Sequence, residues 1–147
     1  MAPHRGAGGF MSLDQFDKFY WPGLKAGILA IIEKGFTPFI FWEGDYTSRL
    51  KYLRELPPGK VIHRLDRTSA YQARELLGSG HCIAGGMTPS LLSTGSTQQV
   101  RDECRRLIDT VGRDGGYIMC HSVPLDDAKI ENVMAMIETT KEYGVYR

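Results

Sequence analysis

The sequence lacks a strong net charge, a long apolar run and an even set of cysteines. Lys and Arg total 18 against 17 Asp and Glu, so a net charge of +1 does not favour nucleic acid or an anionic membrane as partner. The longest apolar run, Ala26–Ile32, is interrupted by Gly27 and is too short to span a bilayer. The odd number and wide spacing of Cys82, Cys104 and Cys120 argue against a disulfide framework and favour a reducing, cytoplasmic setting.

Two further signals are missing. Met1–Phe10 has no apolar segment of the kind that a secretory signal peptide needs, so we expect no such leader. No glycine-rich turn follows an expected strand, and the glycines of Gly6–Gly9 are not preceded by one, which argues against dinucleotide binding.

A helix followed by regular strand–helix repeats is what the sequence does contain. Ser12 and Gln15 form a capping-box pattern, and an apolar stripe at helical spacing follows them, in which Pro22 is expected to produce a split or a kink. The next segment, Thr37–Trp42, is apolar on both faces, which is typical of a strand buried in a parallel sheet. The chain thus begins with a helix, after an irregular lead-in over residues 1–11.

The strand–helix unit then recurs to the end of the chain, which predicts one α/β domain over residues 1–147. Further strands are expected at Lys60–Leu65, His81–Ala84 and Gly116–Cys120. Helices are expected at Thr47–Leu56, Ser69–Leu77, Ser96–Val111 and Lys129–Tyr143, the last capped by Asp126 or Asp127, with a single turn at Pro89–Leu92. Four sequential parallel units fit either an open doubly wound sheet or part of a barrel.

Four segments carry a resemblance to a known superfamily: Ser12–Gly23, Thr37–Leu53, His81–Asp109 and Gly115–Gly144. In order and in content they resemble the C-terminal half of the uroporphyrinogen decarboxylase and cobalamin-dependent methyltransferase superfamily. The resemblance implies four parallel β-α units preceded by a helix, equivalent to half of a (β/α)₈ TIM barrel. It also implies tetrapyrrole decarboxylation by a lyase, or corrinoid-linked methyl transfer with a corrinoid protein as partner, as the activity.

Two departures from the family pattern limit what the resemblance implies. The cobalamin-dependent relatives carry a His-x-Cys zinc motif where this chain has Phe41 and Glu43, and the alignment around Cys120 and His121 is uncertain. Corrinoid or zinc is therefore implied by the resemblance alone, and we expect no bound metal. The essential Asp and Arg residues of the decarboxylases lie in an N-terminal half that this sequence lacks, so whether the chain is an enzyme by itself stays open.

The loops that follow the strands hold the candidate catalytic residues, because active sites of such barrels lie at the carboxyl ends of the strands. Glu43 and Asp45 are candidates for acid–base work or for cation binding. The alternative is that Asp45 caps the following helix and Glu43 pairs with an arginine. His121 is a third candidate, since His121–Pro124 resembles a His-small-aliphatic-Pro stretch of the decarboxylases.

Substrate binding is assigned to His63, Asp66, Arg67 and Trp42. Arg67 offers a fork of donors suited to a carboxylate. The alternatives are a loop ion pair between Asp66 and Arg67, and a purely structural Trp42 in the barrel wall. We expect Glu43, Asp66 and His121 to face one shared cavity at the rim.

Half a barrel would leave two open sheet edges and an uncovered apolar inner face. We expect a homodimer, or a partner chain that supplies the other half of the barrel, to cover them. The alternative function is accordingly a non-catalytic half-barrel assembly domain, or a fragment that self-associates.

Overall fold

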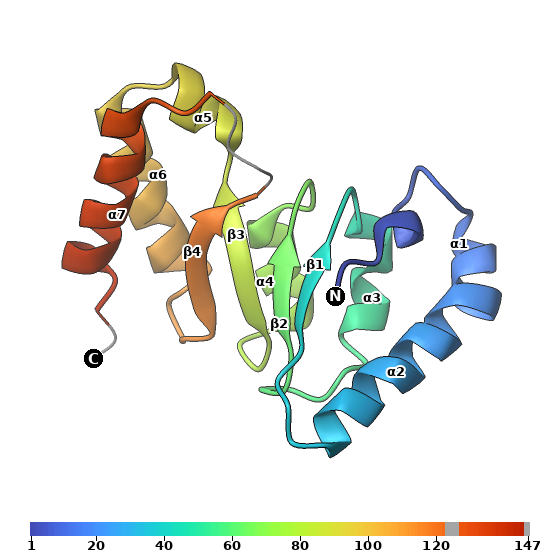
Figure 1. Ribbon diagram of the computed structural model, residues 1–147. Helices are drawn as coiled ribbons and strands as arrows, with labels where there is room; N and C mark the ends of the chain where they lie inside the picture. Colours follow the sequence, from blue (N-terminus) through green and yellow to red (C-terminus); the bar gives the residue numbers. More distant parts are fainter. Residues whose placement is uncertain (123–126, 146–147) are drawn as a thin grey trace.

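The computed structural model describes residues 1–122 and 127–145, and its centre is a four-stranded parallel sheet (Figure 1). The strands are β1 (Phe39–Trp42), β2 (Ile62–Leu65), β3 (Cys82–Met87) and β4 (Tyr117–His121), in the spatial order β1-β2-β3-β4. Each strand pairs in parallel with the next one along the chain. The α/β fold and the strand order expected from the sequence are confirmed, each strand within about two or three residues of its expected bounds.

The helices connect these strands and lie mainly on one side of the sheet, with α3 and α4 behind it in Figure 1. Short 3-10 turns at His4–Gly6 and Thr47–Arg49 supplement them. The α-helices are α1 (Leu13–Gln15), α2 (Trp21–Glu33), α3 (Leu50–Leu53), α4 (Ala70–Leu77), α5 (Pro89–Thr94), α6 (Thr97–Thr110) and α7 (Ile130–Tyr143).

The leading helix is continuous, but it changes from α-helical to π-helical winding just before Pro22, where a split or a kink was expected. Ser12 and Gln15 form the predicted capping box. A π-helical stretch, Phe16–Tyr20, then joins α1 to α2, and Pro22 lies in the first turn of α2. A proline has no amide hydrogen, so the wider π turn ahead of Pro22 avoids an unmet helical hydrogen bond.

Serine caps set the starts of two later helices. Ser69 accepts the Gln72 amide at the start of α4, and Ser96 forms a capping box at the start of α6. The expectation for α7 was wrong for Asp127, because the cap position is Lys129, which makes no side-chain capping bond. Asp126 lies outside the described residues.

The hydrophobic core lies between the sheet and the helices. Ile40, Trp42 and Leu65 point to this helix side of the sheet and are at most 1% exposed. Leucines of α3 and α6 complete the core from the helix layer, among them Leu53 and Leu107. Burying side chains of this size contributes about 1.5–3 kcal/mol each, so this layer supplies most of the stabilisation.

Arg74 on α4 connects several segments at the end of the sheet where the strands begin. Its guanidinium donates to five backbone carbonyl oxygens at 2.6–3.3 Å, those of Gly78, His81, Val111, Gly115 and Gly116. Because a guanidinium offers five N–H donors in a plane, no other side chain could bind this set of acceptors at once. Arg74 therefore joins α4, the start of β3 and the turn before β4.

The N-terminal residues pack along β1 and over its carboxyl end. The main chain of Met1 pairs with Phe39 and Phe41 at the outer edge of β1. Tyr46 donates its hydroxyl to the carbonyl of Pro3 at 2.5 Å. Residues 1–11, expected as an irregular lead-in, thus cover part of one sheet edge.

No helix among the described residues combines the length and the apolar character needed to cross a membrane.

Candidate functional site

Polar side chains gather where the four strands end, at the edge of the sheet that we call the rim. The loops after β1 and β2 place Glu43, Asp45, Asp66 and Arg67 there, and Ser122 follows β4. Two hollows open at the rim and share Asp66 and Arg67 as lining residues. These two residues therefore form the centre of the candidate site.

Asp66 is a carboxylate with one oxygen held and the other without a partner. Its side chain is buried, with a residue exposure of 9%. Oδ2 accepts the Gly44 amide at 2.7 Å, whereas Oδ1 is buried and has no hydrogen-bond partner among the described residues. A buried acceptor that is left unpaired costs roughly 1–3 kcal/mol, so Oδ1 is poised to receive an N–H or O–H donor.

Arg67 supplies the positive charge of the site. It is exposed, and within the described part of the chain its guanidinium forms no ion pair or hydrogen bond. The larger of the two hollows, about 520 Å³, is lined by Tyr71, Thr88 and Ser122 in addition to Asp66 and Arg67. A free fork of N–H donors beside a hollow of this size can bind a ligand carboxylate.

Glu43 and Asp45 line the smaller hollow, about 330 Å³, but both already have partners. Glu43 forms an ion pair with His4, where an arginine was the expected alternative. Asp45 accepts the Thr47 amide at 2.8 Å and so stabilises the 3-10 turn that precedes α3. The hydrogen bonds from Thr47 lower the pKa of the Asp45 carboxyl, which keeps it ionised rather than suited to proton transfer at neutral pH.

The structure places Trp42 and His63 in the core, away from the two hollows. The Trp42 indole N–H donates to Nδ1 of His63 at 3.1 Å, and Nε2 of His63 lies 3.2 Å from Nδ1 of His81. All three side chains are at most 3% exposed. Their alternation along the strands turns them to the helix side, so neither Trp42 nor His63 can touch a ligand at the rim.

His121 is the last residue of β4, and it is paired in register with Met87. Met87 is fully buried in the core, and paired residues of parallel strands point to the same side. His121 therefore turns toward the helix side, and Ser122, the next residue, lines the larger hollow with Asp66. Val123 and Pro124, the rest of the expected motif, lie outside the described residues.

The positions at which the relatives hold zinc do not fit a metal here. The guanidinium of Arg64 stacks on the Phe41 ring, 4.5 Å from its centroid, and its positive charge acts on the Cys120 thiol, where it partly offsets the rise in pKa that burial causes. A fixed positive charge between these two positions opposes a divalent cation. Within the described residues, no group of three His, Cys, Asp or Glu side chains is arranged to hold a metal ion.

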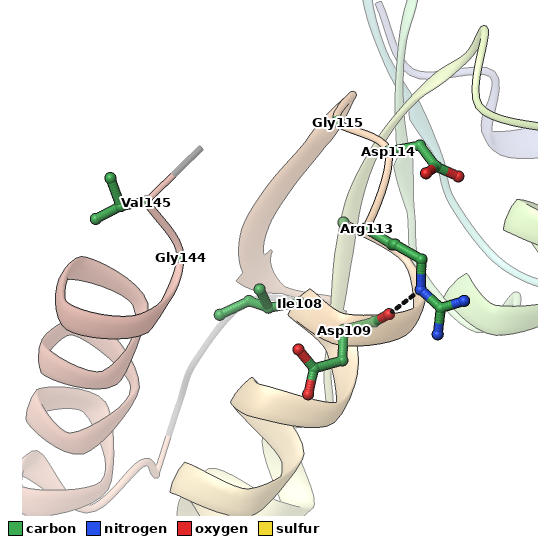
Figure 2. A pocket seen from close by; sticks show the side chains of 8 residues that line it. Ile108, Asp109, Arg113, Asp114, Gly115, Gly144 and Val145 are labelled. Atoms are coloured by element: carbon green, nitrogen blue, oxygen red, sulfur yellow. Dashed lines mark hydrogen bonds between the residues drawn. The ribbon is translucent and has the colours of Figure 1, made fainter. Parts of the chain in front are cut away.

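Another hollow, about 830 Å³, lies at the opposite end of the sheet, where α6 and α7 finish. Figure 2 shows Ile108 and Val145 on its two sides, with Arg113 donating through Nε to the Asp109 carbonyl at 2.9 Å. Glycines and backbone make up much of its wall, and Asp109 and Arg113 are exposed. It brings together no buried polar group, so it is not the candidate site.

Sequence reasoning missed the two residues that shape the inner side of the sheet at the rim. Arg64 was not among the candidates, although a charged residue near the end of a strand was the available signal. Gly44 was also missed: its φ of 90° lets the backbone amide turn toward Asp66. A glycine just after a strand is a signal for such a turn.

Comparisons with known proteins show which family and which fold this chain is similar to. A family model described as Uroporphyrinogen decarboxylase (URO-D) matches residues 4–143. A solved methyltransferase from Methanosarcina mazei superposes with a TM-score of 0.74 at 16% identity, over 99% of this chain and 42% of its own. At that identity the likeness shows the fold, and this chain spans less than half the length of that protein. No curated protein gave a match.

Proposed function

Because the chain belongs to the uroporphyrinogen decarboxylase family, we propose that it forms the C-terminal half of a (β/α)₈-barrel enzyme acting on an acidic tetrapyrrole. Four sequential parallel strands are half of the eight that such a barrel needs. The carboxyl ends of these strands carry the candidate site, as the barrel architecture requires.

The unpartnered Oδ1 of Asp66, next to the free guanidinium of Arg67, is the observation that carries this proposal. A tetrapyrrole whose side chains end in carboxylates offers both complements, a pyrrole N–H for Asp66 and a carboxylate for Arg67. The Asp66 carboxylate would also stabilise positive charge that develops on a ring nitrogen during chemistry at the pyrrole. No step of this role needs a metal at Phe41 or Cys120.

Corrinoid-linked methyl transfer is the other activity of the superfamily, and two observations weigh against it here. Arg64 puts a positive charge between the positions that would ligate zinc. Phe41 has no donor atom. Both features leave the tetrapyrrole function as the better supported of the two.

Equilibrium dialysis against uroporphyrin, a stable octacarboxylate analogue, tests the proposal, with hydroxocobalamin as the competing probe. We expect uroporphyrin to bind, and Arg67→Met to weaken binding by roughly tenfold, the equivalent of one lost charged contact. Asp66→Asn should also weaken binding, since it replaces an ionised acceptor by an amide. Arg113→Met, which removes an exposed arginine at the other end of the sheet, is the matched control.

Binding that is unchanged in both the Asp66 and the Arg67 variants would remove the rim site. Binding of hydroxocobalamin in place of uroporphyrin would return the assignment to methyl transfer.

A non-catalytic assembly role is the second candidate. It is favoured by the side of the sheet that faces away from α3 and α4, over which no described helix lies (Figure 1). Phe39 and Ile118 on that face are 45% and 41% exposed. Tight association without binding of either probe would support this role over the catalytic one.

A further inference from the structure

The wall of the larger hollow at the rim carries more negative than positive side chains. Among the described residues that line it, Asp66 and Glu103 bring carboxylates, and Arg67 alone brings a cation. Ala70 and Tyr71, at the start of α4, also line it, and a helix start adds a partial positive charge but not a full one. The hollow can therefore neutralise one ligand carboxylate.

Glu103, on α6, is fixed in this wall by two neighbours. Its Oε1 accepts the Tyr71 hydroxyl at 2.8 Å, and its Oε2 lies 3.6 Å from Nη1 of Arg106. Burial, and then the hydrogen bond to Glu103, raises the pKa of Tyr71, so the hydroxyl stays a neutral donor. Arg106 lies over the Tyr71 ring, 4.4 Å from its centroid, and does not line the hollow. Glu103 thus presents a fixed negative charge to the hollow, whereas its counter-charge lies outside.

Arg67 and Asp66 define the two polar contacts that a ligand in the hollow can make. The free guanidinium of Arg67 binds a carboxylate, and the unpartnered Oδ1 of Asp66 accepts an N–H. A pyrrole ring with one acidic arm satisfies both. A second carboxylate on the same ring would meet Glu103 in place of a cation, and like charges repel strongly where water is partly excluded.

The size of the hollow suits one ring of a tetrapyrrole. Its volume of about 520 Å³ lies within the range of roughly 300–1,000 Å³ in which pockets bind drug-sized molecules. One pyrrole ring with its arms is smaller than such a molecule, whereas a complete macrocycle with its arms is larger. The charges of the wall therefore act on the arms of a single ring, while the other rings lie outside.

We infer that Glu103 is a specificity-determining residue, which selects a tetrapyrrole ring with one carboxylate arm over a ring with two. This inference rests on the proposed function, and it narrows the substrate class of that site. On the ring that enters the hollow, a neutral group such as a methyl takes the place of the second acidic arm. The negative charge of Glu103 and the single cation Arg67 act together in this choice.

Competition between two porphyrins tests the inference. Uroporphyrin carries two carboxylates on each ring, and coproporphyrin carries one carboxylate and one methyl. We expect wild type to bind coproporphyrin roughly tenfold more tightly than uroporphyrin in equilibrium dialysis. Glu103→Gln keeps an acceptor for the Tyr71 hydroxyl but removes the charge, so E103Q should bind uroporphyrin about tenfold more tightly than wild type does, with coproporphyrin little changed. Added salt should reduce the wild-type preference, since it screens the repulsion.

Glu138→Gln is the matched control. Glu138, on α7, is exposed, lies 3.6 Å from an Arg101 nitrogen and does not line the hollow, so E138Q should keep the wild-type preference. Circular dichroism of each variant shows that it is folded. An equal preference in wild type and E103Q, or a wild type that prefers uroporphyrin, overturns the inference. The proposed function survives either result if uroporphyrin binding still depends on Asp66 and Arg67, and it fails together with the inference if neither porphyrin binds.

Discussion

The indole of Trp42 donates its hydrogen bond to Nδ1 of His63, which fixes the proton of the neutral imidazole on Nε2, facing His81. Burial, and then the nearby His81, lowers the pKa of His63 to about 3. His63 therefore stays neutral in the folded protein over the whole physiological range, and its role is to complete a buried hydrogen-bond chain.

Acid should destabilise the fold through His63. In the unfolded chain the imidazole takes up a proton below about pH 6.5, while in the folded chain it does so only near pH 3. Between these values the unfolded state binds more protons, so stability falls as pH falls, by up to about 1.4 kcal/mol per pH unit for one group. Urea unfolding at pH 7 and pH 5 measures this slope. His63→Gln should flatten it, and an unchanged slope would show that His63 is not the group responsible.

Replacing Arg74 should destabilise the protein far more than its partial exposure indicates. Arg74→Lys keeps the charge but cannot bind five carbonyl oxygens, so we expect a loss of about 2–4 kcal/mol in the free energy of unfolding. Arg113→Lys is the matched control, because Arg113 is exposed and bonds a single carbonyl, that of Asp109 in the last turn of α6 (Figure 2). Equal effects of the two changes would contradict the role given to Arg74.

Gly85 in β3 should not tolerate a side chain. Its φ of 129° is rarely adopted by other residues, and an added Cβ would lie 3.0 Å from the Leu65 carbonyl oxygen. Gly85→Ala should cost about 1–3 kcal/mol in thermal or urea unfolding. Gly27→Ala in α2 meets no atom within 4 Å, and it should instead stabilise by up to about 1 kcal/mol. Opposite signs for the two changes are the expected outcome.

Purified protein should contain far less than one zinc per chain. Phe41 supplies no ligand, and Arg64 holds a positive charge beside Cys120. Elemental analysis of the protein checks this. Near-stoichiometric zinc would contradict it and favour methyl transfer.

The fold was predictable because its signals are local. Most of the strands are short apolar runs, and Ser12 and Ser96 mark helix starts through capping boxes that the structure confirms. The end of β3 was set too early, at Ala84. Gly85 and Gly86 look like a stop in sequence, yet the strand continues through them to Met87 because β4 pairs with both glycines.

The candidate site could be predicted from the sequence only for residues that directly follow a strand. Asp66 and Arg67 follow a strand, so the barrel rule alone places them at the rim. The places of Trp42, His63 and His121 depend on which side of the sheet each strand position faces. The residues of these strands do not alternate between polar and apolar, so the sequence does not show which positions face the helices. Arg64 was missed for the same reason, since only the register shows that it shares a face with Phe41 and Cys120.

The sequential order of the sheet also bears on how the chain folds. Each strand has as its neighbour the strand made just before it, so no strand must insert between two that are already paired. Such local pairing favours fast folding, and it allows the sheet to grow from β1 as the chain leaves the ribosome. The Arg74 contacts can form only late in synthesis, because two of the residues that Arg74 binds, Val111 and Gly116, lie 37 and 42 residues further along the chain. We therefore expect the Arg74 contacts to form after the folding transition state, where they slow unfolding more than they speed folding.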